Sequence, residues 1–225
     1  MLATLRQTIR RLAHEAGFTT TVLLTLALCI GANVAIYAVV DAILVRPLPF
    51  PEGSRLVVLR NSYPKAGAER SGASITNYYD RRKAISAFTS VSVIQEGSVI
   101  VGDEGSPTRV QTGRVSPEFF TTLGAPLALG QMFTDQEMLY GTDQVAILTD
   151  SYWRNHFNAD PAIIGKTFLN DGLPITIRGV LPPNFDYLTN RAQFYRPASH
   201  AKDDVKPTSR HSNNYQMIAR LAPGV

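Results

Sequence analysis

Residues 18–40 read FTTTVLLTLALCIGANVAIYAVV and carry no charged side chain. At about 1.5 Å of rise per residue, a helix of this length reaches roughly 34 Å, enough to cross a ~30 Å hydrocarbon core. No comparable apolar run follows in the sequence. The pattern predicts one membrane-spanning helix near the N-terminus, with a folded domain attached to it.

Two other interpretations of this run fit the sequence less well. A cleaved signal peptide has an apolar region of about 7–15 residues, and this run is longer. A signal peptide also ends in Ala-x-Ala-like spacing, which is not clear at the end of this run. Lipid attachment at Cys29 is disfavoured because the bulky Leu28 precedes the cysteine and further apolar residues follow it. We therefore favour a retained span.

The charges that flank the run predict its orientation. Arg6, Arg10 and Arg11 precede it, opposed by Glu15 alone, whereas the residues that follow it carry little positive charge. Positive charges near a span tend to stay in the cytoplasm. We expect a cytoplasmic N-terminus and residues from about 47 onward on the outer side.

The N-terminal segment has its own helical pattern. Apolar residues share one narrow face from 2 to 16, and the arginines lie on the other, so the segment can rest on an anionic membrane surface. Gly17 offers a break before the span; the alternative is that the segment is the start of one longer helix. The expected division is a cytoplasmic amphipathic helix over 1–16 and a transmembrane helix over 17–46.

Composition limits the classes of function. The chain has 225 residues and a net charge of +4, and the outer part has no block of Lys and Arg, so nucleic acid is not an expected partner. Cys29 is the single cysteine, which excludes a disulfide within the chain. About 180 residues follow the span, enough to build a core.

After the span, the sequence predicts a proline-rich segment followed by short strands and helices. Prolines at 47, 49 and 51 predict an extended collar. The expected elements up to residue 124 are a buried strand (56–59), a polar loop (63–72), a helix (74–87, with Ile75, Tyr78, Tyr79 and Ile85 facing inward), strands (90–95, 98–101 and 108–115, with a hairpin turn at 102–105), and a short helix capped by Ser116 and closed by Gly124.

A second group of elements begins near residue 125. The expected elements are a strand (144–149), a helix capped by Asp150 and ending at 157, a hairpin (166–169 and 175–181) around Asn170-Asp171-Gly172, a polar and mobile segment (199–213), and a last strand (215–221). Hairpins mixed with short helices indicate the α+β class.

Motifs that carry chemistry are weak. Gly165-Lys166-Thr167 resembles the end of a phosphate-binding loop, but Asp160 stands where the earlier glycine is needed, so the start of a strand is favoured. The histidines do not have metal-ligand spacing; they are His14, His156, His200 and His211. We expect no metal site and no cofactor.

Acidic and aromatic residues have ordinary structural explanations. The acidic pairs Asp103/Glu104, Asp135/Glu137 and Asp203/Asp204 are expected to be solvated. The aromatic residues expected in the core are Tyr78, Tyr79, Phe119, Phe120, Trp153 and Phe157; a ligand groove is the alternative. We predict no catalytic, cofactor-binding or metal-ligating residue, and hence a protein that is not an enzyme.

Several stretches together carry a resemblance to a known family. They are Thr25–Asn33 (TLALCIGAN), Arg46–Pro51 (RPLPFP), Val115–Phe120 (VSPEFF), Leu129–Phe133 (LGQMF), Val145–Leu148 (VAIL), Tyr152–Arg154 (YWR), Gly179–Phe185 (GVLPPNF) and Ala219–Gly224 (ARLAPG). In this order they resemble the N-terminal part of MacB/FtsX-like ABC transporter permeases, in particular bacterial permeases without a fused ATPase. Each motif alone is a turn or a cap; their order over the whole chain makes the resemblance specific.

The resemblance implies a division of the outer part and a set of partners. It implies a MacB-like periplasmic core domain over 47–225, porter-like over about 52–124 and 214–225, with a subdomain inserted over about 125–213. Its implied partners are the lipid bilayer, a separate cytosolic ABC ATPase, other permease segments and a second copy of the chain in a homodimer. The implied location is the bacterial inner membrane, with the outer domain periplasmic or extracellular.

The resemblance also implies a function. Such permeases convey movements of their membrane helices to the outer domain, which is non-catalytic, so no catalytic residue is carried over. We expect part of an ABC-type permease that couples conformational change to export or envelope processes. The alternative is a membrane-tethered binding or adaptor module, and an anchored enzyme ranks third. Family members have further spans after this domain, so we also expect this chain to be a truncated product or a fragment.

The orientation is testable with fusions. A reporter that is active only outside the cytoplasm, fused after Val225, is expected to be fully active, because the charge asymmetry retains the N-terminus inside. A matched reporter active only in the cytoplasm should give background signal. Activity of the cytoplasmic reporter alone would overturn the predicted orientation.

Overall fold

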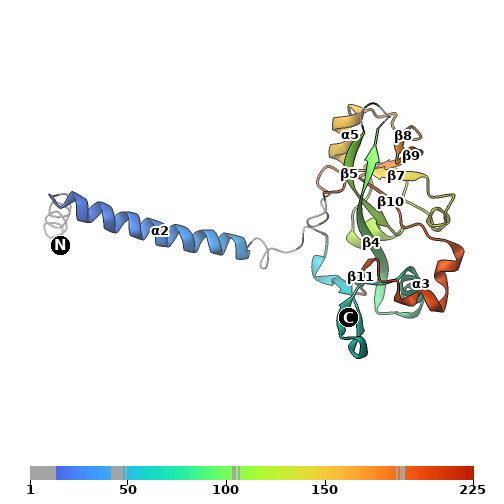
Figure 1. Ribbon diagram of the computed structural model, residues 1–225, viewed down its shortest axis with the longest axis horizontal. Coiled ribbons are helices and arrows are strands. Elements are labelled where there is room, and N and C mark those ends of the chain that lie inside the picture. Colours follow the sequence, from blue (N-terminus) through green and yellow to red (C-terminus); the bar gives the residue numbers. More distant parts are fainter. Residues whose placement is uncertain are drawn as a thin grey trace. The chain divides into compact units, whose positions relative to one another are not determined.

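The computed structural model describes residues 14–41, 48, 50–102, 105, 107–185, 187 and 191–225 (Figure 1). The chain separates into two units, Met1–Leu48 and Pro49–Val225. Each unit is described by itself.

The first unit contains helix α2 (Ala16–Val40), which runs without interruption through the apolar stretch. Within the described residues it is the one helix long and apolar enough to cross a membrane, and none of its side chains is buried. The hydroxyls of Thr21 and Thr25 donate to the carbonyls of Gly17 and Thr21 at 2.9 and 2.8 Å, so these polar atoms are satisfied within the helix.

The helix bears on two expectations for the N-terminal region. Gly17 does not interrupt the helix, since α2 begins at Ala16 and includes Gly17. The amphipathic helix expected over 1–16 falls almost wholly on residues 1–13, which lie outside the described residues, as does the 42–46 end of the expected span.

The second unit is built on one nine-stranded mixed sheet. In spatial order its path is β1 (Leu56–Leu59), β11 (Gln216–Leu221), β4 (Phe88–Val101), β5 (Thr108–Val115), β10 (Phe194–Pro197), β7 (Val145–Leu148), β9 (Leu173–Val180) and β6 (Leu129–Gly130), with β8 (Thr167–Asn170) paired to β4 and β9. The pairs β5–β10 and β7–β9 are parallel and the others are antiparallel. The α+β class predicted from sequence is confirmed.

Short helices and turns complete the second unit. They are α3 (Ile75–Ala84), α4 (Phe119–Leu123), α5 (Asp150–Phe157) and the 3₁₀ turns η2 (Gly53–Arg55), η3 (Pro64–Ala66), η4 (Asp135–Met138), η5 (Lys202–Val205) and η6 (Pro207–His211). A separate two-stranded hairpin pairs β2 (Asn61–Tyr63) with β3 (Ala68–Ser71).

The apolar side chains form three clusters that follow the alternation of the strands. On one face, α4 contributes Phe119 and Phe120 to a cluster that includes Ile94 of β4 and Val115 of β5. On the other face, a cluster under α3 includes Val93, and a cluster beside α5 includes Val110. The last two clusters therefore share a face and lie at different heights along β4.

Strand β4 connects these clusters. The sequence predicted two strands, 90–95 and 98–101, because Glu96 and Gly97 interrupt the apolar alternation. This prediction is wrong: β4 is one strand of 14 residues, and Glu96 and Gly97 pair with Gly113 and Thr112 of β5. Continuous pairing with β5 holds the two polar positions in the ladder. At about 3.3 Å per residue, β4 is ~46 Å long.

Other predicted elements are confirmed with shifted ends. Helix α5 is capped by Thr149, whose hydroxyl accepts from Tyr152 N at 3.3 Å, rather than by Asp150. The hydroxyl of Ser116 accepts from Val93 N, so it anchors β4, and α4 begins at Phe119. Gly124 closes α4 with φ +73°, as predicted.

Two expected loops are ordered by hydrogen bonds. The segment 63–72 forms most of the β2–β3 hairpin, so the prediction of a polar loop is wrong. Within the segment 199–213, η5 and η6 lie along α3, and the hydroxyl of Thr76 donates to the carbonyls of Asp204 and Lys206 at 3.0 and 3.3 Å. Strand β10 was not predicted.

Burial also differs from expectation at two positions. The sequence predicted a buried strand over 56–59, but β1 is half-buried and Val58 is 57% exposed. The reason is that β1 lies at the edge of the sheet and pairs with β11 alone. Ile85 lies beyond the end of α3 and is 37% exposed, whereas Ile75 and Tyr78 are buried as predicted.

Gly130 provides a test of the sheet packing. Its φ is +83°, and a Cβ there would lie 2.1 Å from the carbonyl oxygen of Arg178. Gly130→Ala is expected to lower the free energy of unfolding by about 2–4 kcal/mol, because it combines left-handed strain with a clash against backbone. Denaturant unfolding of the full chain in detergent, followed by Trp153 fluorescence, measures this.

The matched control is Gly97→Ala, because a Cβ at Gly97 meets nothing within 4 Å. It should change the free energy of unfolding by less than about 1 kcal/mol. Equal effects of the two substitutions would contradict the described packing of β6 on β9.

Candidate functional site

Helix α3 is positioned by a cap that the sequence dictates. The hydroxyl of Ser74 accepts from Asn77 N at 3.1 Å, and the side chain of Asn77 accepts from Ser74 N at 3.2 Å. This capping box satisfies two donors at the start of the helix. It fixes the rotation of α3, so that Tyr78 faces the sheet and Arg82, one turn later, faces α4 and η4.

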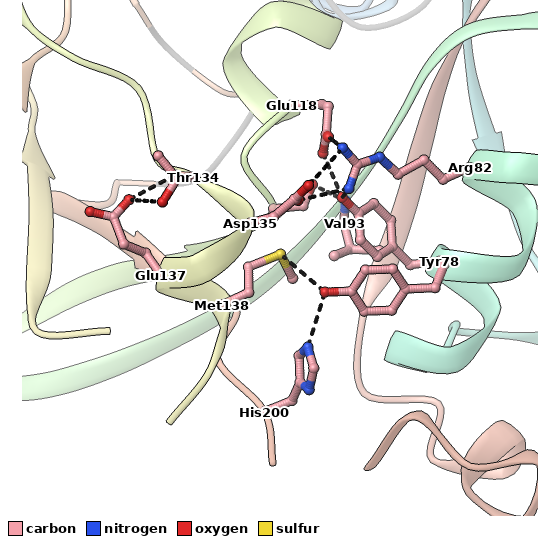
Figure 2. A network of polar contacts seen from close by, with 11 residues as sticks. Tyr78, Arg82, Val93, Glu118, Thr134, Asp135, Glu137, Met138 and His200 are labelled. Carbon is pink, nitrogen blue, oxygen red and sulfur yellow. Dashed lines mark hydrogen bonds and ion pairs between the residues drawn. The ribbon is translucent and has the colours of Figure 1, made fainter. Parts of the chain in front are cut away.

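The carboxylate of Glu118, the residue before α4, contacts two side chains of α3 (Figure 2). The hydroxyl of Tyr78 donates to Glu118 Oε2 at 2.5 Å, and Arg82 Nη2 lies 2.5 Å from Glu118 Oε1. Arg82 also forms a two-pronged ion pair with Asp135 of η4, at 2.7 and 3.2 Å. The Arg82 guanidinium therefore joins α3, the start of α4 and η4.

The environment moves the pKa values of these groups away from neutrality. Burial, followed by the nearby Glu118 carboxylate, raises the pKa of Tyr78 above its ordinary value. The hydrogen bond to Asp135 raises the pKa of Arg82. General acids and bases work best with a pKa near the operating pH. Tyr78 stays neutral and Arg82 stays charged, which suits a structural junction better than proton transfer.

A second set of contacts joins α3 to His200, which follows β10. The hydroxyl of Tyr79 lies 3.1 Å from His200 Nε2 and 3.9 Å from the sulfur of Met138. His200 Nδ1 lies 2.8 Å from the carbonyl oxygen of Ala201 and must donate to it. In the neutral ring Nε2 then accepts from Tyr79. His200, 4% exposed, serves as a buried connector.

The acidic residues of η4 are not simply solvated. Glu137 is 8% exposed, accepts from Thr134 N and Oγ1 at 2.7 and 3.0 Å, and lies 3.1 Å from Arg178 of β9. The expectation of a solvated pair is therefore wrong for Glu137, and Asp135 is exposed but paired with Arg82. We name these connected groups the α3 junction; its polar members are Tyr78, Tyr79, Arg82, Glu118, Asp135, Glu137, Arg178 and His200.

The remaining residues singled out from the sequence lie apart from the α3 junction. Gly165 has φ +85° in the turn before β8, and Lys166 forms an ion pair with Asp160, so this motif starts a strand. His156 stacks on Tyr152 of α5, and His211 packs against Tyr63. Asp103 and Glu104 lie outside the described residues. The structure groups no three potential metal ligands among the residues it describes.

The acidic pair in η5 is capped and paired. Asp204 accepts from Ala201 N at 2.8 Å, and Asp203 lies 2.9 Å from Lys206 Nζ. The expected core positions of the aromatic residues are confirmed for Phe119 and Phe120, both fully buried, and Trp153 is half-buried and donates to the carbonyl of Asp160.

Sequence reasoning missed most of the α3 junction. Glu118 lies 40 positions from Tyr78, Asp135 lies 53 positions from Arg82, and His200 lies 121 positions from Tyr79. One available signal was the basic end of α3, Arg81-Arg82-Lys83, which favours the C-terminus of a helix and needs acidic partners when packed.

A second cluster holds the start of the second unit against its last strand. Arg55 Nε and Nη2 both donate to the carbonyl of Leu221, at 3.0 and 2.6 Å, and Arg220 Nε donates to the carbonyl of Thr122 at 2.8 Å. Glu52 lies 2.5 Å from Arg55 and 3.6 Å from Arg220. We name Glu52, Arg55, Arg220 and Leu221 the clasp.

Aromatic packing reinforces the clasp on the first face of the sheet. The ring of Phe50 lies 6.5 Å from the rings of both Phe185 and Tyr187. Burial, with a contribution from Glu96, raises the pKa of Tyr187 to about 12. Phe50 thus forms an aromatic anchor before β1 begins.

Comparison with protein-family models identifies one family. The family model for the MacB-like periplasmic core domain matches residues 19–225. No curated protein matches the chain.

Three solved structures share the fold. The periplasmic region of MacB from Actinobacillus actinomycetemcomitans has a TM-score of 0.54 and 18% identity, over 76% of this chain and 75% of that one. A domain of a permease protein from Porphyromonas gingivalis has 0.57 and 17%, over 78% and 79%. The extracellular domain of the noncanonical ABC-type transporter YknZ from Gram-positive bacteria has 0.51 and 14%, over 75% and 83%.

The coupling within the α3 junction is measurable by a double-mutant cycle. Tyr78→Phe is expected to lower the free energy of unfolding by about 1–2 kcal/mol, since it leaves a half-buried carboxylate with one partner fewer. Combined with Glu118→Gln, the coupling energy should be about 1 kcal/mol or more. Denaturant unfolding of the full chain provides the values.

Lys206→Gln is the control, because its ion pair with Asp203 is exposed at the surface. It should change stability by less than about 0.5 kcal/mol. Strict additivity of Tyr78→Phe and Glu118→Gln would show that the two residues are not connected.

Proposed function

The chain belongs to the family of MacB-like periplasmic core domains, and from this we propose that it couples motion in the membrane to a process outside it. It would act as the membrane-anchored outer part of an ABC-type permease, without catalysis of its own. The bacterial inner membrane, a cytoplasmic N-terminus, a separate cytosolic ABC ATPase, other permease segments and a second copy are the proposed setting. The clasp is the observation that carries this proposal.

The clasp offers a mechanical input. Strand β1 pairs antiparallel with β11, with Leu56 opposite Arg220, and Arg55 ties the residue before β1 to the end of β11. A displacement of the clasp residues before β1 would therefore act on two neighbouring strands together. Packed elements and ladder hydrogen bonds carry such displacements as rigid-body shifts.

The sheet offers a path from this input to the far end of the domain. Strand β11 pairs with β4 along six positions, from Gln216 opposite Ile94 to Leu221 opposite Phe88. The same strand β4 reaches Val101, opposite Asn170 of the β8–β9 hairpin. Since β4 is one unbroken strand, movement at the clasp would reach both ends of β4.

The two-subdomain division is a further part of the proposal. The porter-like part, about 52–124 and 214–225, would contain most of the apolar cluster under α3, and the inserted part, about 125–213, most of the cluster beside α5. Met138 and Ala198 of the inserted part join the first cluster, and Val110 of the porter-like part joins the second. In Figure 1, α3 and α5 lie toward opposite ends of β4. The α3 junction then limits how far the two parts can move apart, because Arg82 belongs to one and Asp135 to the other.

Hydrogen exchange tests the coupling role. The tagged full chain is purified from the membranes of its own bacterium in nanodiscs, and amide exchange is compared with ATP plus vanadate and with ADP. We expect an ABC ATPase to co-purify, and the amides of β1, β11 and β4 to change protection by about tenfold between the two states.

An Arg55→Gln/Arg220→Gln variant should lose the change in β4 and keep the ATPase, because it opens the clasp alone. Arg154→Gln, which alters an exposed ion pair on α5, should keep both. Absence of an ATPase together with capture of a soluble ligand would favour the tethered binding module, and nucleotide-independent exchange would overturn the coupling role.

A further inference from the structure

A polar row crosses the sheet between the two apolar clusters that share one face. Gln95 of β4 is paired with Arg114 of β5, and Arg114 is paired with Arg196 of β10. Cross-strand partners project from the same face, here the face of Val93 and Val110. Polar residues at this position are unusual for a sheet face that is otherwise apolar under α3 and beside α5.

A cleft of about 270 Å³ opens over part of this row. Gln95, Arg114 and His200 line it, together with Ser209 of η6 and with Ser212 and Asn214 before β11. Its size suits a small molecule, and its walls are rich in groups that donate and accept hydrogen bonds.

The hydrogen-bonding capacity of the walls is largely unused. The side chain of Arg114 forms no hydrogen bond or ion pair within the part of the chain that the structure describes, although that of Arg109 on the same strand donates to Ser98 at 3.0 Å. Among those described residues, the hydroxyls of Tyr140 and Ser199 have no partner either. These groups are free to bind a ligand.

The polar row beside the cleft, Arg114 with Arg196, carries more positive than negative charge, although Arg196 itself does not line the cleft. Arg196 shares one carboxylate, Asp143, at 3.5 Å, and its Nε is buried without a partner. Burial, partly offset by Asp143, lowers the pKa of Arg196, and Arg114 adds to that lowering. Guanidinium groups remain charged in proteins, so two adjacent arginines leave an excess of positive charge.

The acidic groups near the cleft are already engaged. Asp204 lies on its wall and accepts from Ala201 N at 2.8 Å. Asp143 accepts from Gly141 N at 3.2 Å in addition to its pairing with Arg196. An incoming anion would therefore find in Arg114 an exposed, unpaired guanidinium, the group best suited to bind an oxyanion through two parallel hydrogen bonds.

We propose that this cleft binds a small polar molecule that carries an oxyanion, with Arg114 holding the oxyanion and the surrounding hydroxyl and amide groups holding the remainder. Both phosphate and carboxylate have the required geometry. The site is independent of the clasp, and it requires neither an ATPase nor motion of the sheet.

Calorimetric titration of the full chain in detergent tests the site with two probes, inorganic phosphate and glucuronate, at constant ionic strength against chloride. We expect saturable binding of at least one probe, which identifies the preferred oxyanion. Arg114→Gln should weaken this binding at least tenfold. Arg109→Gln removes the same charge from the same strand and should leave the affinity within about twofold.

Folding of the variants is checked by thermal unfolding without ligand. Arg114→Gln should unfold at the same or a higher temperature than the wild type, because it relieves repulsion with Arg196. Saturable binding that Arg114→Gln abolishes and Arg109→Gln retains supports the proposal. Lack of saturable binding by both probes, or equal weakening by both variants, overturns it.

Discussion

The pairing of β10 with β5 is the constraint on which the second unit depends. Strand β10 lies between β5 and β7, parallel to the first and antiparallel to the second, and so joins the two groups of elements into one sheet. Its inward residues reach both faces: Tyr195 packs against Phe119 and Phe120, and Phe194 packs against Tyr152. Because neighbouring strands share ladder hydrogen bonds, neither group can shift far without breaking this pairing.

The sequence predicted local features well and distant pairings poorly. The β8–β9 hairpin was predicted because Asp-Gly favours the positive φ angles that a two-residue hairpin turn requires. Asp171 and Gly172 do adopt positive φ in the structure. Strand β10 was missed because Arg196 and Pro197 read as loop residues, and its parallel partner β5 is remote in the chain. The α3 junction was missed for the same reason: its ion pairs connect segments that no local periodicity relates.

The structure suggests how one domain can be both firm and adjustable. Apolar clusters at the two ends of β4 give each end its own packing, while polar groups lie between them on the shared face. Ion pairs such as Arg82–Asp135 can exchange partners with water at modest free-energy cost, whereas a packed apolar interface separates only in large steps. The coupling role proposed above would use both properties, and the raised pKa values of Tyr78 and Arg82 hold these two groups in fixed charge states.

The central claim is that residues 49–225 respond as one body because they share one sheet, and equilibrium unfolding examines it most directly. Trp153, the single tryptophan, reports on α5, and a fluorophore at Val58→Cys, in a Cys29→Ser background, reports on the edge strand β1. The account predicts denaturant transitions with the same midpoint for both probes. Two separated midpoints would show that the groups of strands unfold independently and would contradict it.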